Sequence, residues 1–398
     1  MRTVFDATTI KGMRLPNRLV RSATWEGLGD PDGRVNDGVL SIYRGLADGG
    51  VGLIITGYLA VRSDGRQHST QLGADRDELI PGLAGLATAV HDHGGTVVGQ
   101  IVHCGGQAVR AASGGQDPVA PSAVASPGYP EVPHKLSVAS IRDLVACFAA
   151  AAGRLRTAGF DGVQLHGAHG YLLAQFLSPA RNRRHDHYGG SLDNRIRFTC
   201  EVLEAVRAEV GPDWPVMIKL NGHDFLEGST TERDSTHLAA ALADAGIDAI
   251  EVSGGTGGSG KLGSARRHIE TAHDEAYFLP QARAIREAAP GVPLILVGGM
   301  RSLEKMEAVL VSGAADYFAM ARPLIREPDL PARWASGDRR RAACVSCGGC
   351  FVPAARGEGI RCVNTSERVG HRPLYAFLTW SLLLASAPHA PQDALRAS

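Results

Sequence analysis

Short apolar runs alternate along the chain with longer segments whose apolar residues recur at helical spacing. The short runs are rich in β-branched residues and apolar at consecutive positions, which is typical of strands buried on both faces of a sheet. Eight such runs lie at residues 19–24, 52–59, 97–102, 162–165, 216–220, 249–252, 294–297 and 317–321. Strands that alternate with helices in this way are expected to run parallel, with right-handed crossovers.

The segments between the runs carry helix signals. Ser140 followed by Asp143 resembles a capping box, and a helix is expected from there to Gly159. A second helix is expected over residues 230–245, with Gly246 as the glycine that ends it. Strand–helix units in this number predict an α/β fold whose strands close into a TIM (β/α)8 barrel. A doubly wound open sheet is the alternative, because counting the units does not exclude it.

Two segments interrupt the alternation. Residues 103–136 are rich in Gly, Pro, Ser and Ala and too long for a tight turn, so we expect an inserted loop over the barrel mouth. We expect residues 1–335 to form the barrel, and residues 336–398 to form a short cysteine-rich extension with a C-terminal tail. The apolar run at 377–385 predicts either a helix docked on the body or on another subunit, or a frayed end.

Composition and charge narrow the class of protein. The chain has 398 residues, of which 44% are hydrophobic and 21% charged, so a sizeable core is expected. Lys+Arg and Asp+Glu both number 41, which gives no electrostatic case for nucleic acid or an anionic membrane. The first residues lack the apolar core expected of a secretory signal, and the longest apolar run is far short of the roughly 20 residues that span a bilayer. We expect a cytoplasmic homo-oligomer that acts on a small molecule.

Polar residues and glycines lie at or just after the ends of the predicted strands, which is where barrel enzymes place their active sites. They are Gln100 and His103, His166, His169 and Tyr171, Lys219 and Asn221, Ser253 and Gly254, the pair Gly298-Gly299, and Arg322. The last two strand ends commonly bind phosphate in barrels, and two glycines followed by an arginine suit that task. The alternative is that the glycines only turn the chain and that Arg322 pairs with Glu327.

Two other motifs are less specific. His166 and His169 could be histidines satisfied by their neighbours or a metal pair, but their spacing is not that of the helical zinc-protease motif. The stretch GTGGSG at 255–260 matches a dinucleotide-binding pattern. It does not open the helix of a first βαβ unit, so a mobile loop is the favoured interpretation.

The cysteines form a specific pattern. Of seven in the chain, four are clustered as Cys344-x2-Cys347-x2-Cys350-x11-Cys362. An odd, clustered set in a long chain indicates a reducing compartment and a metal site. Four thiolates at this spacing bind zinc or an iron–sulfur cluster, and three close cysteines with a distant fourth are more typical of the cluster.

Most of the chain, from about residue 4 to residue 335, resembles the Old Yellow Enzyme family of FMN-dependent oxidoreductases. Four stretches carry the resemblance, and the second is highly specific: LPNRLVRSAT at 15–24, HGAHGYLLAQFLSPARNRRHDHYGGSLDNR at 166–195, VGGM at 297–300 and ARPLIREPDL at 321–330. The family is a TIM barrel with FMN at its C-terminal face. The resemblance implies hydride transfer from NAD(P)H through FMN to the activated C=C of an α,β-unsaturated carbonyl compound.

The resemblance also assigns residues. Along the flavin ring it places Ala23, Thr24, Gly57 and Tyr58, with Gln100 at the ring edge and Lys219 at the pyrimidine side. The phosphate would be held by Gly298, Gly299, Ala321 and Arg322. His166 and His169 would bind the substrate's carbonyl oxygen, and Tyr171 would donate the proton. Trp25 would shape the substrate pocket, although many members have Cys or Thr there, and glycine is often found where Ala321 stands.

The cysteine pattern is similar to that of the branch that contains 2,4-dienoyl-CoA reductase and trimethylamine dehydrogenase. In that branch a [4Fe–4S] cluster passes electrons between FMN and another centre, and a dinucleotide-binding domain follows the cysteines. If Cys344, Cys347, Cys350 and Cys362 hold such a cluster, a separate electron-transfer protein is the expected partner. An iron–sulfur flavin dehydrogenase of this kind is therefore one alternative function. A non-catalytic barrel that binds flavin or a phosphorylated ligand is the alternative of another class.

Overall fold

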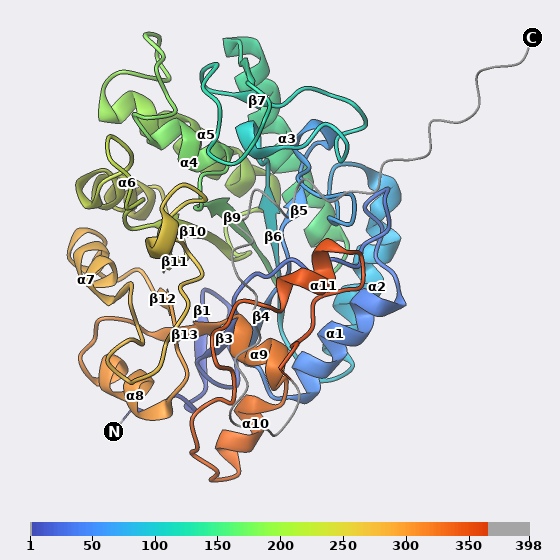
Figure 1. Cartoon of the computed structure of the whole chain (residues 1–398), viewed down its shortest axis with the longest axis vertical. Coiled ribbons are helices and arrows are strands. Elements are labelled where there is room, and N and C mark those ends of the chain that lie inside the picture. The colour runs from blue at the N-terminus through green and yellow to red at the C-terminus, as the bar shows by residue number, and fades with distance from the viewer. Residues whose placement is uncertain (1, 365–398) are drawn as a thin grey trace, which may run out of the picture.

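The computed structural model describes residues 2–364, so the helix expected at 377–385 lies outside the described residues. A single parallel sheet closes into a barrel, in the order β4-β3-β13-β12-β11-β10-β9-β6 with β4 paired to β6 (Figure 1). The eight strands are β3 (Leu19–Arg21), β4 (Leu53–Ile55), β6 (Val97–Val102), β9 (Gly162–Gly167), β10 (Val216–Asn221), β11 (Ala249–Ser253), β12 (Leu294–Val297) and β13 (Tyr317–Met320). The predicted TIM barrel is confirmed.

Helices surround the strands, as Figure 1 shows. They are α1 (Asp37–Asp48), α2 (Ile80–His91), α3 (Val138–Thr157), α4 (Leu172–Leu177), α5 (Leu192–Val210), α6 (Glu232–Asp244), α7 (Leu279–Ala288), α8 (Leu303–Val311), α9 (Arg322–Arg326), α10 (Leu330–Ala335) and α11 (Phe351–Ala355). Short 3-10 turns are η1 (Ser63–Gly65), η2 (Asp77–Leu79), η3 (Gly105–Gln107) and η4 (Gly260–Leu262). The run predicted at 52–59 is divided, because β5 (Leu59–Ala60) follows β4 after a break and pairs with the end of β6.

An antiparallel hairpin of β1 (Thr8–Ile10) and β2 (Met13–Leu15) packs against apolar side chains inside the barrel. Ile10 and Leu15 join a buried cluster with residues from seven barrel strands, including Val20 and Met217. Full burial of such side chains stabilises the fold by about 1.5–3 kcal/mol each. A second and larger core lies between the strands and the surrounding helices.

Two helix ends test the predicted caps. Helix α3 begins after Ser137, whose hydroxyl accepts from Ser140 N–H at 3.0 Å, so the cap predicted at Ser140 was wrong. Ser137 has extended backbone, whereas Ser140 already lies inside the helix, where it cannot act as the cap. Helix α6 has a complete capping box at Thr231, and Gly246 follows its end with φ of 81°. The glycine ending predicted for that helix is confirmed.

Two irregular segments complete the fold. Residues 103–136 contain η3 and a short parallel pair, β7 (Val119–Ala120) and β8 (His134–Lys135), and they contact the segment after β9. After α10, the chain returns to the barrel: Ile360 N–H donates to the Glu26 carbonyl at 2.7 Å, and Ala354 packs against Gly27. Within residues 2–364, no helix is both long and apolar enough to cross a membrane.

Candidate active site

The structure brings the predicted histidines and tyrosine together at the end of β9. His166 lies in the strand, and its ring centroid is 5.1 Å from that of His169 and 4.7 Å from that of Tyr171. His169 has a left-handed backbone with φ of 58°, which side-chain-bearing residues rarely adopt. Its N–H donates to Asn221 Oδ1 at 3.2 Å, and Gln107 Nε2 donates to its carbonyl at 3.1 Å. These bonds hold the conformation that turns the ring toward His166.

Both histidines are neutral at ordinary pH. Burial, followed by the charges of His169 and Lys219, holds the pKa of His166 well below its usual value. Burial and Lys219 lower the pKa of His169 to about 3. His166 Nδ1 accepts from Ala168 N–H at 3.3 Å, which leaves the proton on Nε2. His169 Nε2 lies 2.8 Å from Ser253 Oγ; when that hydroxyl donates, the His169 proton is on Nδ1.

Tyr171 is a protonated phenol in a buried setting. It precedes α4, and its hydroxyl donates to Gln67 Oε1 at 2.9 Å. The Tyr58 hydroxyl donates to the same oxygen at 2.8 Å. Burial raises the pKa of both phenols well above the usual value, with Cys104 adding to the effect at Tyr171. Gln67 was missed in the sequence because it lies in a loop without a motif.

A polar chain crosses the barrel interior. Gln100 Nε2 donates to Gln164 Oε1 at 2.7 Å, and Gln164 Nε2 donates to Glu251 Oε2 at 3.0 Å. Glu251 also forms an ion pair with Lys219 at 2.9 Å and accepts from Ser22 Oγ at 2.6 Å. Glu251 is fully buried and was missed, although a carboxylate inside an apolar run is a signal that could have found it.

Gln100 keeps one polar atom unused. Its Oε1 is buried and has no hydrogen-bond partner among the described residues. Leaving a buried acceptor unpaired costs about 1–3 kcal/mol, so a ligand that donates a hydrogen bond there would be favoured.

The loop after β3 carries three of the predicted residues. Ala23 lies against the apolar cluster inside the barrel, and Thr24 Oγ1 donates to the Ser22 carbonyl at 2.9 Å. Trp25 is buried and stacks on His68, with ring centroids 3.9 Å apart and planes 14° apart. Trp25 Nε1 and His68 Nε2 are both buried without a partner among residues 2–364. His68 was not foreseen, because nothing in its sequence surroundings marks it.

Gly57 is held by a buried acid. Its N–H donates to Glu26 Oε1 and to the Tyr43 hydroxyl, at 2.9 Å in each case. A Cβ at position 57 would lie 2.3 Å from Glu26 Oε2. Tyr43 also donates to Glu26, and burial raises the pKa of that carboxyl group. Glycine is therefore required here by the approach of Glu26, which the sequence did not reveal.

The strand ends predicted to bind phosphate lie near one another. Gly298 and Gly299 have φ of 126° and 74°, and a Cβ on Gly299 would lie 2.9 Å from the Tyr277 ring. The Tyr277 ring also lies 4.6 Å from the Arg266 guanidinium, which stacks over it. The two glycines thus allow an aromatic ring to approach the backbone closely.

Arg322 follows β13 and reaches two backbone carbonyls. Its Nη2 donates to the Arg266 carbonyl at 2.7 Å and its Nη1 to the Ser346 carbonyl at 3.3 Å. Ala321 offers its own carbonyl to Arg21 at 2.6 Å. The alternative pairing of Arg322 with Glu327 is not seen, since Glu327 pairs with Arg333 at 3.0 Å.

The four clustered cysteines lie in the segment that follows the barrel. Cys350 is buried beside Trp25, and burial, opposed by Arg322, raises the pKa of its thiol to about 11. Cys344 and Cys347 lie close enough to Cys350 to raise the pKa of its thiol further. Cys362 is placed differently, since its Sγ lies 3.8 Å from Arg326 Nη1. In the described part of the chain, no group of three or more His, Cys, Asp or Glu side chains is arranged to hold a metal ion. The thiols as they stand therefore do not form a ligand set.

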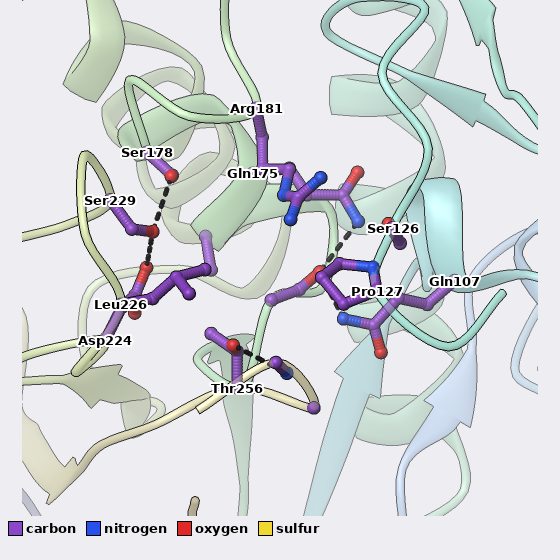
Figure 2. Close-up of a pocket in the computed structure, with 14 residues that line it drawn as sticks. Gln107, Ser126, Pro127, Gln175, Ser178, Arg181, Asp224, Leu226, Ser229 and Thr256 are labelled. Carbon is purple, nitrogen blue, oxygen red and sulfur yellow. Dashed lines mark hydrogen bonds between the residues drawn. The ribbon is translucent and has the colours of Figure 1, made fainter. Parts of the chain in front are cut away.

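Figure 2 shows a small cavity that is lined by Gly170 and by residues of neighbouring segments. Gln107 and Gln175 both donate to the Gly170 carbonyl at 2.7 Å and line this cavity. Thr256, from the GTGGSG stretch, also lines the cavity, and its backbone forms an isolated parallel β-bridge with that of His169. The stretch is a loop whose last residue begins the 3-10 turn η4, so it opens no α-helix of the dinucleotide-binding kind.

Comparison with known proteins identifies the family. The NADH:flavin oxidoreductase / NADH oxidase family matches residues 3–340. A metal reductase of Desulforamulus reducens is 36% identical over 370 residues, which cover 92% of this chain and 54% of that protein. An NADPH dehydrogenase of Clostridium acetobutylicum is 36% identical over 326 residues, which cover 82% of this chain and 92% of that protein.

The fold is shared as well. The structure of the Old Yellow Enzyme homologue from Zymomonas mobilis aligns with a TM-score of 0.74 at 27% identity, covering 87% of this chain and 96% of that one. The chain spans about half the length of the metal reductase and nearly all of the NADPH dehydrogenase. The resemblance seen in the sequence is confirmed, and the chain belongs to the NADH:flavin oxidoreductase / NADH oxidase family.

Proposed function

We propose that this chain is an FMN-dependent oxidoreductase that takes hydride from NAD(P)H and delivers it to the activated C=C of an α,β-unsaturated carbonyl compound. The observation that carries the proposal is the grouping of two neutral histidines and a protonated tyrosine at the end of β9. Membership of a flavin oxidoreductase family supports it.

The residues present fit FMN. The unpaired Gln100 Oε1 suits a hydrogen-bond donor on the edge of the flavin ring. The ring would lie along Ala23, Thr24, Gly57 and Tyr58, with Lys219 at its pyrimidine side. The phosphate would be held by Gly298, Gly299, Ala321 and Arg322, where glycine backbone and a guanidinium suit an anion. The N–H of Gly57 is already used by Glu26, so its contribution would be space for the ring.

The substrate end of the site is built for a carbonyl group that gains negative charge. FMN, when bound, supplies the hydride that reaches the β carbon of the substrate. His166 Nε2–H and His169 Nδ1–H stabilise the oxygen, because both rings donate without carrying a charge of their own. Tyr171 stays protonated and delivers its proton to the α carbon. Trp25 lines the pocket and limits its shape.

Substituting Tyr171→Phe tests the proposal. Reduction of 2-cyclohexen-1-one by the reduced holoenzyme should slow by about a hundredfold, since general acids contribute about 10²–10⁴. Reduction of the bound flavin by NAD(P)H should be unchanged, because that step needs no proton from Tyr171. Equal slowing of both steps would remove Tyr171 from the donor role.

The histidines are tested by ligand binding. His166→Ala should weaken binding of a phenol, whose oxygen imitates the developing charge, and a matched His237→Ala variant serves as control. His237 pairs with Asp193 in an exposed position and lies outside the proposed site. Unchanged phenol affinity in the His166 variant would contradict its contact with the substrate oxygen.

We further propose that Cys344, Cys347, Cys350 and Cys362 hold a [4Fe–4S] cluster, with zinc as the alternative. The spacing supports this, as does the proximity of the first three thiols, although the thiols would have to turn toward one another. All seven cysteines are unpaired, which suits the reducing cytoplasm we expect. Iron, zinc and acid-labile sulfide assayed on anaerobically purified protein would decide. Iron and sulfide near four per chain support the cluster.

A second candidate is an iron–sulfur flavin dehydrogenase that exchanges electrons with a separate partner. It is favoured by the cysteine spacing and by likeness to a metal reductase, of which the matched residues cover 54%. It predicts poor turnover with NAD(P)H alone and turnover restored by an added electron carrier. If the protein binds flavin but shows no turnover with any reductant, the remaining alternative is a barrel that binds its ligand without catalysis.

A further inference from the structure

We propose that Gln67 is a positioning residue that holds the hydroxyl groups of Tyr171 and Tyr58 as a pair, so that Tyr58 stabilises the anion left when Tyr171 gives up its proton. The proposal rests on the proposed function. Gln67 is 2% exposed, and its Oε1 accepts from Tyr171 at 2.9 Å and from Tyr58 at 2.8 Å. A carbonyl oxygen has two lone pairs, so these two bonds use its full capacity.

The orientation of the Gln67 amide is set by its other contacts. Its Nε2 donates to the Tyr129 hydroxyl, which leaves Oε1 facing the two phenols. Its backbone N–H donates to Gln71 Oε1 at 2.8 Å, and Gln71 Nε2 in turn donates to the Tyr58 carbonyl at 3.2 Å. Side chain and backbone are therefore both tied to the segment that carries Tyr58.

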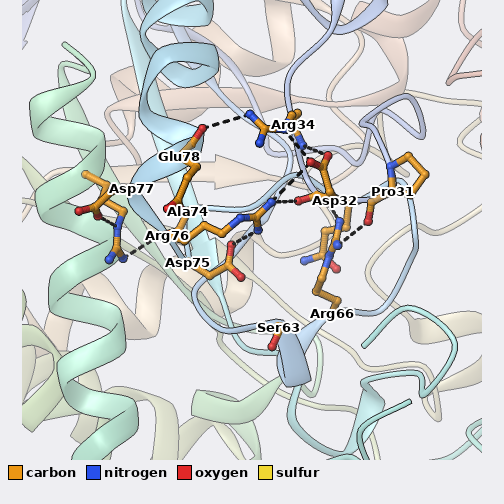
Figure 3. A network of polar contacts seen from close by, with 12 residues as sticks. Pro31, Asp32, Arg34, Ser63, Arg66, Ala74, Asp75, Arg76, Asp77 and Glu78 are labelled. Carbon is orange, nitrogen blue, oxygen red and sulfur yellow. Dashed lines mark hydrogen bonds and ion pairs between the residues drawn. The ribbon is translucent and has the colours of Figure 1, made fainter. Parts of the chain in front are cut away.

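The loop around Gln67 is anchored by Arg66. Nη1 of Arg66 donates to the Pro31 carbonyl at 2.7 Å, and Nη2 donates to the Gln71 carbonyl. The Arg66 carbonyl accepts from Val109 N–H at 3.0 Å. Figure 3 shows Arg66 beside a network of ion pairs that ties the neighbouring loops together. Gln67 is thus held at a fixed distance from the two phenols.

The chemistry gives this arrangement a consequence. When the O–H bond of Tyr171 breaks and the proton forms a C–H bond at the substrate's α carbon, Tyr171 is left as a buried phenolate. A buried anion is costly unless it is hydrogen-bonded. The Tyr58 and Tyr171 hydroxyls both donate to Gln67 Oε1, and their ring centroids lie 5.7 Å apart. The Tyr58 hydroxyl can therefore turn from Gln67 toward the Tyr171 oxygen.

Among the described residues, the titratable groups that face Tyr171 include no cation that could pair with its phenolate. They are Tyr58, Cys104, Tyr129 and His166, of which Cys104 and Tyr129 raise the pKa of Tyr171 further. His166 is neutral, since burial lowers its pKa. A neighbouring phenol that donates a hydrogen bond is therefore the available means of stabilising the phenolate.

The test uses FMN-loaded protein in stopped flow, with 2-cyclohexen-1-one reoxidising the reduced flavin. Gln67→Leu should slow this step about tenfold, because Tyr58 is then no longer held where its hydroxyl can donate to the developing phenolate, and increase its solvent isotope effect. In a Tyr171→Phe background the same substitution should cause no further slowing, because no phenolate forms. An exposed glutamine gives the matched control, Gln116→Leu, which should leave the rate unchanged.

The outcomes separate this inference from the function on which it rests. If Tyr171→Phe slows the step but Gln67→Leu does not, only the inference is overturned. Equal slowing by Gln67→Leu in the Tyr171→Phe background would show a merely structural role and also overturn it. If Tyr171→Phe has no effect, the proposed donor fails and the inference with it.

If Gln67→Leu does not fold, a variant that keeps the shape of the side chain provides the test. Gln67→Glu still accepts from both phenols, but its negative charge opposes a phenolate at Tyr171. It should slow the same step at least as much as the leucine variant and raise the pH at which the rate of enone reduction changes with Tyr171 ionisation. A wild-type rate and pH profile in Gln67→Glu would overturn the inference.

Discussion

The ion pair between Lys219 and Glu251 lies inside the barrel, where neither charge reaches solvent. Glu251 is fully buried, and Lys219 is 3% exposed. The pair is joined at 2.9 Å, and Ser22 bonds both partners, at 2.6 Å to the acid and 2.8 Å to the amine. Replacing Glu251 with Gln keeps the size of the side chain and one acceptor oxygen. It removes the charge that compensates Lys219 and turns the other acceptor oxygen into an NH2 donor.

The expected cost follows from that burial. Breaking a buried ion pair by removing one partner typically costs about 3–5 kcal/mol, because the other charge is left uncompensated. Glu251→Gln should lie near 3 kcal/mol, about the low end, since the amide oxygen can still accept from Ser22. Lys219→Met should cost a similar amount. The double variant should cost clearly less than the sum, with a coupling free energy of about 2 kcal/mol.

Urea unfolding of the apoprotein measures these free energies, with the four proteins compared by circular dichroism. The exposed Glu227 supplies the matched control, and Glu227→Gln should stay within about 0.5 kcal/mol of the parent. A cost for Glu251→Gln of less than about 1 kcal/mol, together with additive effects in the double variant, would refute the reasoning.

The remaining predictions concern a glycine, a histidine and the cysteines. Gly57→Ala should destabilise the protein by about 2 kcal/mol or more, because the added Cβ would lie 2.3 Å from Glu26. Gly45→Ala in α1, where a Cβ meets nothing within 4 Å, should stabilise the protein by up to about 1 kcal/mol. Thermal unfolding of both variants measures these changes. His169, with its pKa near 3 when folded, takes up a proton more readily when unfolded, so stability is full above about pH 6.5 and falls as the pH is lowered. Between about pH 7 and pH 5 this loss should be about 2 kcal/mol, and His169→Asn should reduce it in urea titrations. Cys362→Ser should lower the iron content if the cluster is present and leave it unchanged if it is not.

Much of the fold was predictable because the signal is local. Strands buried on both faces must be apolar at consecutive positions, and that pattern marked all eight barrel strands. The end of a strand is less exactly visible, because β9 runs to Gly167, past its predicted end at residue 165. His166, His169 and Tyr171 could still be placed at one end of the barrel. The choice of Ser140 as a cap failed because two serines three residues apart both suit that role, and only backbone conformation separates them.

The missing parts of the site depend on contacts between distant residues. Gln67 meets Tyr171 across 104 positions of the chain, and Gln164 meets Glu251 across 87. Neither contact follows from periodicity, since it depends on how the barrel closes. The cysteine spacing likewise indicates which thiols are near one another in sequence, but not where each thiol points.

The most direct test of the central claim is a two-step anaerobic titration of purified protein followed through the absorption of its flavin. The proposed function predicts bound FMN, loss of the oxidised flavin bands when NAD(P)H is added, and their return when 2-cyclohexen-1-one follows. Protein that binds no flavin after reconstitution with FMN, or flavin that NAD(P)H reduces but the enone does not reoxidise, would contradict it.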